Sequence, residues 1–210
     1  GGGDAIANDY CHRAVDIVDA TPESPDESIT PFTLTAATFD CPAATCTPDA
    51  QNDVWFDYTA TCTGKAHFET CGADSNSSPD TNLVVYEGCE RCPPLSGDPV
   101  GCNQDAYMGC GLGSRVTVDV TEGQCYKVRV ADNEGFGGSG NLTIHCDPIA
   151  LCCYYDANGQ LLKMCGNTTE VVCNAESHEG RSTYWASGQL CGEGTCPLLA
   201  CVNREGSCLE

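Results

Sequence analysis

The sequence predicts an all-β protein: an antiparallel two-sheet sandwich of jelly-roll type, followed by a small disulfide-stapled module. Three observations support this prediction. Apolar and polar residues alternate in several short segments, with the two-residue period of a half-buried strand. Turn-forming residues separate these segments, and no long segment has the period of a helix. Cysteine makes up 19 of the 210 residues, a density at which disulfides are expected to stabilise the fold.

The strongest strand signal covers residues 53–62. Residues 65–71 are expected to return beside it after a turn at Thr63-Gly64. In such a hairpin Cys62 and Cys71 are about 20 Å apart, whereas a disulfide needs Cα atoms within about 7 Å. We therefore expect these two cysteines not to pair, and Cys71 to bond within the 89–110 loop. The residues expected to point inward from the first strand are Val54, Phe56, Tyr58, Ala60 and Cys62.

The other predicted strands alternate in the same way. They cover residues 29–36, 81–87, 115–121, 125–130 and 141–146. Cys41 and Cys46 are close enough in sequence to staple the loop between them. After residue 148 the sequence becomes polar and Cys-rich, which predicts a sandwich domain at 1–148 and a Cys-rich module at 149–210. A hairpin is expected to join residues 153–155 to 161–162. Cys152 and Cys153 should face opposite ways and have different partners.

The charge balance excludes some partners. Thirty acidic residues face nine basic ones, giving a formal charge of −21, so we expect no nucleic-acid partner. No apolar run approaches the roughly 18–20 residues that span a bilayer, so no membrane span is expected. Acidic loops suit calcium, a cation that takes oxygen ligands, and they also keep an extracellular protein soluble. Residues 132–135 fit either a calcium loop or a turn.

The cysteines indicate an oxidising compartment, so we expect a secreted protein, extracellular or at the cell surface. The start Gly-Gly-Gly-Asp, without Met or an apolar leader, is interpreted as a mature form. Because the count is odd, one thiol stays free or bridges to another copy. All but one are expected in disulfides: Cys11, Cys41, Cys46, Cys62, Cys71, Cys89, Cys92, Cys102, Cys110, Cys125, Cys146, Cys152, Cys153, Cys165, Cys173, Cys191, Cys196, Cys201 and Cys208. Cys89-x-x-Cys92 is interpreted as structural rather than redox-active or zinc-binding.

An ordered set of short motifs runs through the first region. It comprises Asn8-Asp9, Phe32-Thr33, Asp53-Val54-Trp55-Phe56, Asp80-Thr81, Cys102-Asn103-x-Asp105, Ser114-Arg115-Val116, Gly123-x-x-Tyr126-x-x-Arg129-Val130 and Gly140-x-Leu142-Thr143-Ile144. In this order the motifs resemble the bacterial pre-peptidase C-terminal domain, in the version found in secreted planctomycete proteins, over about residues 5–146. The resemblance implies a jelly-roll-like β-sandwich that is mostly non-catalytic, some members of which bind matrix polymers with calcium.

By the same resemblance, calcium ligands are expected at Asn8, Asp9, Asp80 and Asp105, although Gln104 stands where an acid is common. The opening Cys152-Cys153 and the stretch Gly192-Glu193-Gly194-Thr195-Cys196 resemble a small module found beside such domains.

Catalysis has little support in the sequence, and we expect no enzyme. The sequence contains no His-Glu-x-x-His and no Gly-x-Ser-x-Gly motif. Trp55 is expected on the outward face of its strand between Asp53 and Asp57. It is either covered by a loop or a contact platform for sugar or another subunit.

Two hypotheses about function follow. The first is a secreted structural protein, a self-assembling and filament-like subunit held by disulfides and by strand or tail exchange. The alternative is a calcium-dependent carbohydrate- or matrix-binding adhesion module of a secreted hydrolase. Calcium is the one cofactor that the sequence suggests.

Overall fold

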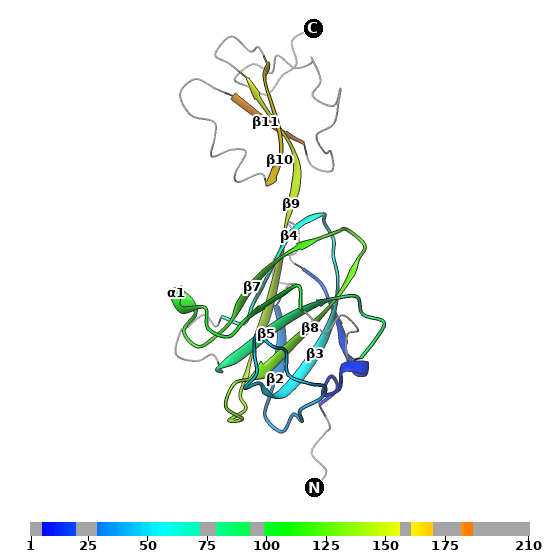
Figure 1. The fold of residues 1–210 in the computed structure, drawn as a ribbon, viewed down its shortest axis with the longest axis vertical. Helices are drawn as coiled ribbons and strands as arrows, with labels where there is room; N and C mark the ends of the chain where they lie inside the picture. The colour runs from blue at the N-terminus through cyan, green and yellow to red at the C-terminus, as the bar shows by residue number, and fades with distance from the viewer. Residues whose placement is uncertain are drawn as a thin grey trace. The chain divides into compact units, whose positions relative to one another are not determined.

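The computed structural model describes residues 6–19, 29–71, 79–92, 99–155, 161–169 and 182–186. The chain divides into two compact units, Gly1–Cys146 and Asp147–Glu210, next to the boundary expected from the sequence. The first unit is an antiparallel-rich sandwich of two sheets, which confirms the predicted fold class (Figure 1).

The first sheet has the strand order β1-β3-β8-β5-β6. Its strands are β1 Val15–Ile17, β3 Gln51–Thr59, β8 Cys125–Asp132, β5 Thr81–Glu87 and β6 Gly101–Asn103. All of its pairings are antiparallel except that of β1 with β3. Two short helical pieces flank it, a 3₁₀ turn η1 at Cys11–Arg13 and α1 at Tyr107–Cys110.

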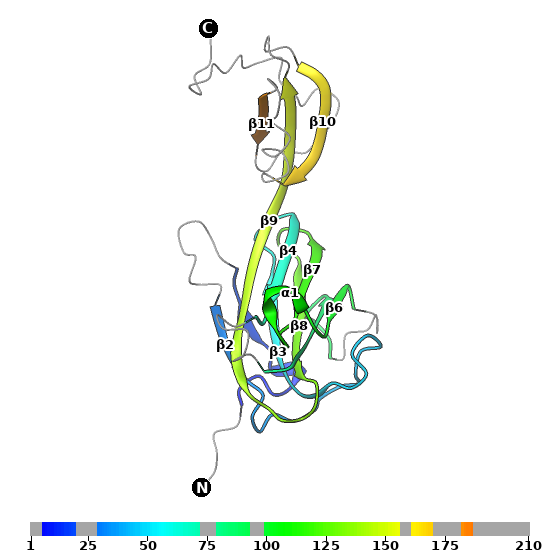
Figure 2. The same cartoon turned by 90° about the vertical axis from the view of Figure 1, so that its left-hand side faces the viewer.

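In the second sheet β9 lies between β4 and β2, and β4 also pairs with β7 (Figure 2). These strands are β2 Ile29–Thr33, β4 Gly64–Glu69, β7 Arg115–Val120 and β9 Ser139–Tyr155. Towards its end β9 pairs with β10 Leu161–Thr169 and β11 Ser182–Ala186, which belong to the second unit. The predicted hairpin of the second unit is confirmed, because Leu161 is opposite Tyr155. The stretch at 192–196 and Cys173, Cys191, Cys196, Cys201 and Cys208 lie outside the described residues.

The predicted strands are confirmed, but the hairpin between residues 53–62 and 65–71 is wrong. β3 and β4 belong to different sheets, so the chain crosses the sandwich between them. The conclusion about Cys62 and Cys71 is nevertheless confirmed, since Cys62 bonds to Cys146 and Cys71 to Cys110. The strand at 29–36 is shorter than expected. β2 ends at Thr33, and a turn follows in which the Ala37 amide donates to the carbonyl of Leu34 and Ala36 has a left-handed φ of 66°.

The core lies between the two sheets. Val54, Phe56 and Tyr58 of β3 are at most 1% exposed there, as their alternation predicts. The second sheet contributes the other side of the core through side chains such as Phe68 and Leu142. Burial of these side chains is the main apolar contribution to stability, at about 1.5–3 kcal/mol for each large aliphatic or aromatic residue.

The opposite face of the first sheet is also buried, as in the first of the two alternatives given for Trp55. A second apolar cluster there contains Cys11, Ala44, Trp55, Val84 and Tyr86. Trp55 is 0% exposed and its ring stacks on Tyr86 with 6.3 Å between centroids. The prediction that Trp55 is a contact platform is therefore wrong, because the N-terminal segment and the 38–46 loop cover its ring. The consecutive apolar residues of β5 are the sequence signal for a strand buried on both faces.

A buried cation fixes this covering layer to the sheet. Arg129 of β8 is 1% exposed, and its Nε donates to Asp53 Oδ2 at 2.7 Å. Its other nitrogens donate to the carbonyls of Pro42 (2.9 Å) and Asp40 (3.0 Å) in the loop. Its guanidinium carbon lies 5.0 Å from the ring centroid of Trp55. A buried charge is stable only when it is paired and hydrogen-bonded, so these bonds from Arg129 fix the position of the loop.

Five disulfides connect ten of the eleven cysteines in the first unit: Cys11–Cys92, Cys46–Cys102, Cys62–Cys146, Cys71–Cys110 and Cys89–Cys125. The expected Cys41–Cys46 staple is wrong, because Cys46 bonds to Cys102 and Cys41 is free. Cys89 and Cys92 are both structural, as interpreted, but each bonds to a distant strand or turn. These bonds are consistent with a secreted or extracellular protein. Within the described residues, no helix is long and apolar enough to cross a membrane.

Replacing Arg129 by Met should reduce the free energy of unfolding by about 3–5 kcal/mol at pH 7, because it leaves the Asp53 carboxylate buried without its cation. The double variant Arg129→Met with Asp53→Asn should recover a large part of this loss.

Burial raises the pKa of Asp53 from 3.8 to about 6, against the opposing effect of Arg129. Because the folded state then binds the proton more tightly, this group's contribution to stability falls as pH rises from about 4 to about 6. Urea unfolding from pH 4 to pH 7 measures both the loss caused by Arg129→Met and the change of stability with pH.

Lys65→Met is the matched control. Lys65 pairs with Asp119 on the surface, where the two side chains are 48% and 86% exposed. Its loss should cost about 1 kcal/mol or less. Equal losses for the Arg129 and Lys65 variants would contradict the structural role of Arg129.

Candidate functional site

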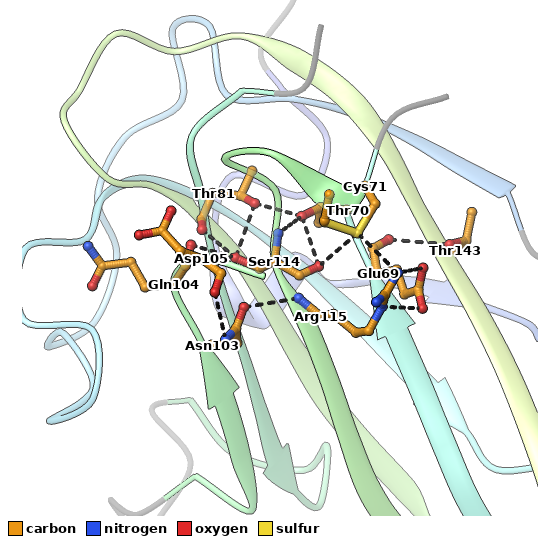
Figure 3. Close-up of a disulfide and its surroundings, with 11 residues drawn as sticks. Glu69, Thr70, Cys71, Thr81, Asn103, Gln104, Asp105, Ser114, Arg115 and Thr143 are labelled. Atoms are coloured by element: carbon orange, nitrogen blue, oxygen red, sulfur yellow. Dashed lines mark hydrogen bonds and ion pairs between the residues drawn. A yellow bond between two sulfur atoms is a disulfide. The ribbon is translucent and has the colours of Figure 1, made fainter. Parts of the chain in front are cut away.

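One end of the sandwich carries a buried network of hydroxyl groups that joins the two sheets (Figure 3). Thr70 follows β4, Thr81 begins β5 and Ser114 precedes β7, and all three are 0% exposed. The hydroxyls of Thr70 and Thr81 are 2.6 Å apart, and the Ser114 amide donates to Thr70 Oγ1 at 2.8 Å. The Cys71–Cys110 disulfide closes the same end. This end of the fold is therefore rigid.

The network positions the loop that follows β6. The Ser114 hydroxyl donates to the carbonyl of Gln104 at 3.1 Å, and the Arg115 amide donates to Asn103 Oδ1 at 3.1 Å. Asn103 in turn donates from Nδ2 to the carbonyl of Asp105 at 3.4 Å. Figure 3 shows Gln104 and Asp105 beside the hydroxyl network. The loop thus places two polar side chains next to the start of β5.

Amide and carboxylate side chains from three segments meet here, and we call them the Asp80 cluster: Asp80, Asn82, Gln104, Asp105 and Asn133. Asn133 donates from Nδ2 to Asp80 Oδ2 at 3.4 Å. The Oδ1 atom of Asn133 accepts from Gln104 Nε2 at 2.8 Å and from Asn82 Nδ2 at 3.4 Å. Asp105 is close enough to act electrostatically on Asp80.

Two oxygens of the Asp80 cluster are buried without a hydrogen-bond partner. They are Asp80 Oδ1 and Asn82 Oδ1, and the Asn82 residue is 0% exposed. Burial raises the pKa of Asp80, the hydrogen bond from Asn133 opposes this, and Asp105, Glu134 and Asp132 raise the pKa further. Buried acceptors without partners cost free energy. A hard cation relieves both the missing contacts and the repulsion, and calcium takes carboxylate and amide oxygens as ligands.

The structure separates the four residues that were predicted to bind calcium. Asp80 and Asp105 lie in the Asp80 cluster. Asn8 instead donates from Nδ2 to the carbonyl of Trp55 on β3 at 3.1 Å. Asp9 is 8% exposed, and its carboxylate accepts from the amide and the hydroxyl of Thr38 at 2.5 and 2.9 Å. β8 lies between β3 and β5, so Asn8 and Asp9 do not lie with Asp80 and Asp105, and the four residues do not form one site.

Asn82 is the residue that the sequence analysis missed. It stands two positions after Asp80 at the start of a strand, so both side chains point to the same face of the sheet. That spacing, combined with the acidic residue, was the signal available in the sequence.

A second group of potential metal ligands does not form a metal centre. Asp57, Cys89 and Cys125 have ligand atoms within 4.8 Å of one another, the one such group of three among the described residues. The two cysteines form a disulfide, which removes their thiolates, and Asp57 pairs with Lys127 at 2.6 Å. The Asp80 cluster differs because side-chain amides provide part of its donor set.

Cys41 is the unpaired thiol of the first unit and is half-buried. Burial raises its pKa from 9.0 to about 11, and the neighbouring Asp40 adds to this. It adopts a left-handed φ of 66° in the loop that covers Arg129. At neutral pH the thiol is therefore protonated and a slow nucleophile.

Comparisons with known proteins add little to this description. No family model matches the chain. No curated protein matches it. Among solved structures, the chain is similar to a periplasmic inhibitor of g-type lysozyme from Aeromonas hydrophila, with 12% identity, a TM-score of 0.32, and coverage of 62% of this chain and 93% of that one. At this TM-score the likeness carries no argument about function.

Calcium should raise the melting temperature of the wild-type chain. At a concentration 100-fold above the dissociation constant, the free energy of unfolding is expected to increase by about 2.7 kcal/mol. Asp80→Asn should abolish this response, because it removes a charged ligand. The same variant should be more stable than wild type in chelator, because it removes the buried charge and its repulsion from neighbouring acidic residues, which together raise the pKa of Asp80. Thermal melts in calcium and in chelator measure both effects.

Asp119→Asn serves as the control, since this carboxylate is 86% exposed and lies at the other end of β7. It should keep the calcium response. A wild-type chain whose melting temperature is the same in calcium and in chelator would contradict the cation site.

Proposed function

We propose that the first unit is a non-catalytic extracellular binding module whose contact surface is organised by calcium at the Asp80 cluster. The observation that carries the proposal is the pair of buried, unpartnered oxygens on Asp80 and Asn82, surrounded by acidic residues. The ion would add a further link between three segments that strand pairing already holds side by side: the start of β5, the loop after β6 and the end of β8.

Three further features support this function. The five disulfides suit an extracellular environment, where calcium is plentiful. The resemblance of the motif series to the pre-peptidase C-terminal domain implies matrix binding with calcium. The hydroxyl network beside the cluster holds the flanking loops in place, so the surface is preorganised for a partner.

Retention on an insoluble matrix should depend on calcium. The intact chain is expected to sediment with at least one of a panel of cellulose, chitin and collagen fibrils in calcium, and to remain in the supernatant in chelator. Asp80→Asn should stay in the supernatant in both conditions, and Asp119→Asn should behave as wild type. Retention by the Asp80→Asn variant that equals wild type would show that the cluster does not organise the binding surface.

Cys41 favours a second candidate function, a subunit that assembles through an intermolecular disulfide. It is the one cysteine of the first unit without a partner, and it is partly accessible. Strand exchange has less support at two edges of the first unit. β1 has only three residues, and β2 carries Pro31, which cannot donate to a ladder.

If Cys41 links two copies, non-reducing gels of the oxidised chain should show a dimer that Cys41→Ser lacks. Because the pKa of Cys41 is raised to about 11, linking should be slow at neutral pH. As long as the pH is below the pKa, each pH unit by which it is raised should increase the thiolate population about tenfold, and the linking rate should rise with it. A dimer that persists in Cys41→Ser would assign the bond to another cysteine and reject this role.

A further inference from the structure

Phe136 has the largest exposed fraction among the large hydrophobic side chains that the structure describes. It is 84% exposed, at the tip of the loop that connects β8 to β9. Single exposed apolar residues are common on protein surfaces. Phe136 differs from these because the loop beneath it is held in one conformation.

Asp132 organises this loop. Its side chain is nearly buried, and its Oδ1 accepts from the amides of Glu134 (2.9 Å) and Gly135 (3.0 Å). Its other oxygen accepts from the amide of Gly137. Gly137 has a left-handed φ of 72°, and a Cβ there would lie 3.1 Å from the Thr35 backbone. Any other residue at position 137 would be strained and crowded, so the turn favours glycine and holds the backbone of Phe136 in place.

Both ends of the loop touch the segment that carries Asp80. At the first end, the Asn133 amide donates to the carbonyl of Asp80 at 3.1 Å. At the other end, a Cβ on Gly138 would lie 2.8 Å from Cβ of Pro79. Three residues of chain reach at most about 11 Å, so Phe136 lies within that distance of Asn133. This distance is short enough for one extended ligand to reach both the loop tip and the Asp80 cluster.

The chemistry of the surface indicates the class of ligand. A flat exposed ring suits the apolar face of a pyranose, a nucleobase or a cation. The charge of −21 repels nucleic acid and other polyanions. A basic protein would compete with calcium for the same carboxylates. A neutral polymer rich in hydroxyls is compatible with a calcium-loaded cluster, since hydroxyls donate to carboxylates and also coordinate calcium.

We propose that Phe136 is the aromatic contact for a neutral polysaccharide that also lies across the Asp80 cluster. The inference rests on the proposed function and names its ligand class and a specificity-determining residue. Trp55, the ring that the sequence suggested for contact with sugar, is buried, whereas Phe136 is exposed.

Binding isotherms of the full chain on microcrystalline cellulose, chitin and insoluble xylan test the proposal. In calcium, wild type should bind at least one of them, and Phe136→Ala should weaken binding by about tenfold, equivalent to about 1.4 kcal/mol. Phe136→Trp should bind at least as well as wild type. Val18→Ala removes another apolar side chain, 53% exposed, and should bind as wild type. All variants should keep the melting temperature and the calcium response, since Phe136 is not part of the core.

Each other outcome overturns the inference or one stated part of it. Unchanged binding by Phe136→Ala rejects the residue. A chain that responds to calcium in melts but binds none of the three polymers rejects the ligand class and leaves the calcium site standing. Salt-sensitive binding to a polylysine resin without polysaccharide binding identifies a basic partner instead. Phe136-dependent polysaccharide binding that is identical in chelator rejects the proposed role of calcium and retains the contact.

Discussion

The buried guanidinium of Arg129 is the constraint on which the first unit depends. It sits on the face of a sheet that a simple sandwich leaves in water, and its partners come from both the sheet and the loop above it. Asp53 provides the charge, while Pro42 and Asp40 provide carbonyl oxygens from the loop. A loop that lifted away would leave a cation and a carboxylate unpaired in an apolar surrounding, which is strongly unfavourable. Two disulfides, Cys11–Cys92 and Cys46–Cys102, fasten the same layer covalently.

Because this face is covered, the first sheet has little accessible surface for binding. The first sheet contributes one face to the core and the other to the second apolar cluster, so its central strands offer little accessible side-chain chemistry. Two of the buried oxygens without a partner, Asp80 Oδ1 and Asn82 Oδ1, occur where a strand begins. The Asp80 cluster and Phe136 both lie at strand ends or on loops that internal hydrogen bonds hold in place. This matches the general pattern in which a rigid scaffold positions binding residues on its loops.

The sequence predicted the strands well because alternation reports directly on which side chains face the core. Val54, Phe56 and Tyr58 are buried as expected. Alternation does not report what covers the other face, and this is why Trp55 was misassigned. It also does not report which sheet a strand joins. Residues 53–62 and 65–71 look like a hairpin locally, yet hydrogen bonding to β8 and β7 separates them. The exclusion of a Cys62–Cys71 bond was correct although the geometry assumed for it was not.

The structure separates the four residues expected to bind a cation, because the fold uses the oxygens of each residue differently. Asp9 and Asp80 are both acidic residues, and the one useful difference in their local sequences, Asn82 two positions after Asp80, was not used. The carboxylate of Asp9 is occupied by the amide and hydroxyl of Thr38, so it stabilises the fold and has little capacity for an ion. Asp80 retains a buried oxygen without a partner, beside the equally unpartnered amide oxygen of Asn82. A binding site is identified by the polar atoms that the fold leaves unsatisfied, and that property exists only once the tertiary structure has brought β5, β6 and β8 together.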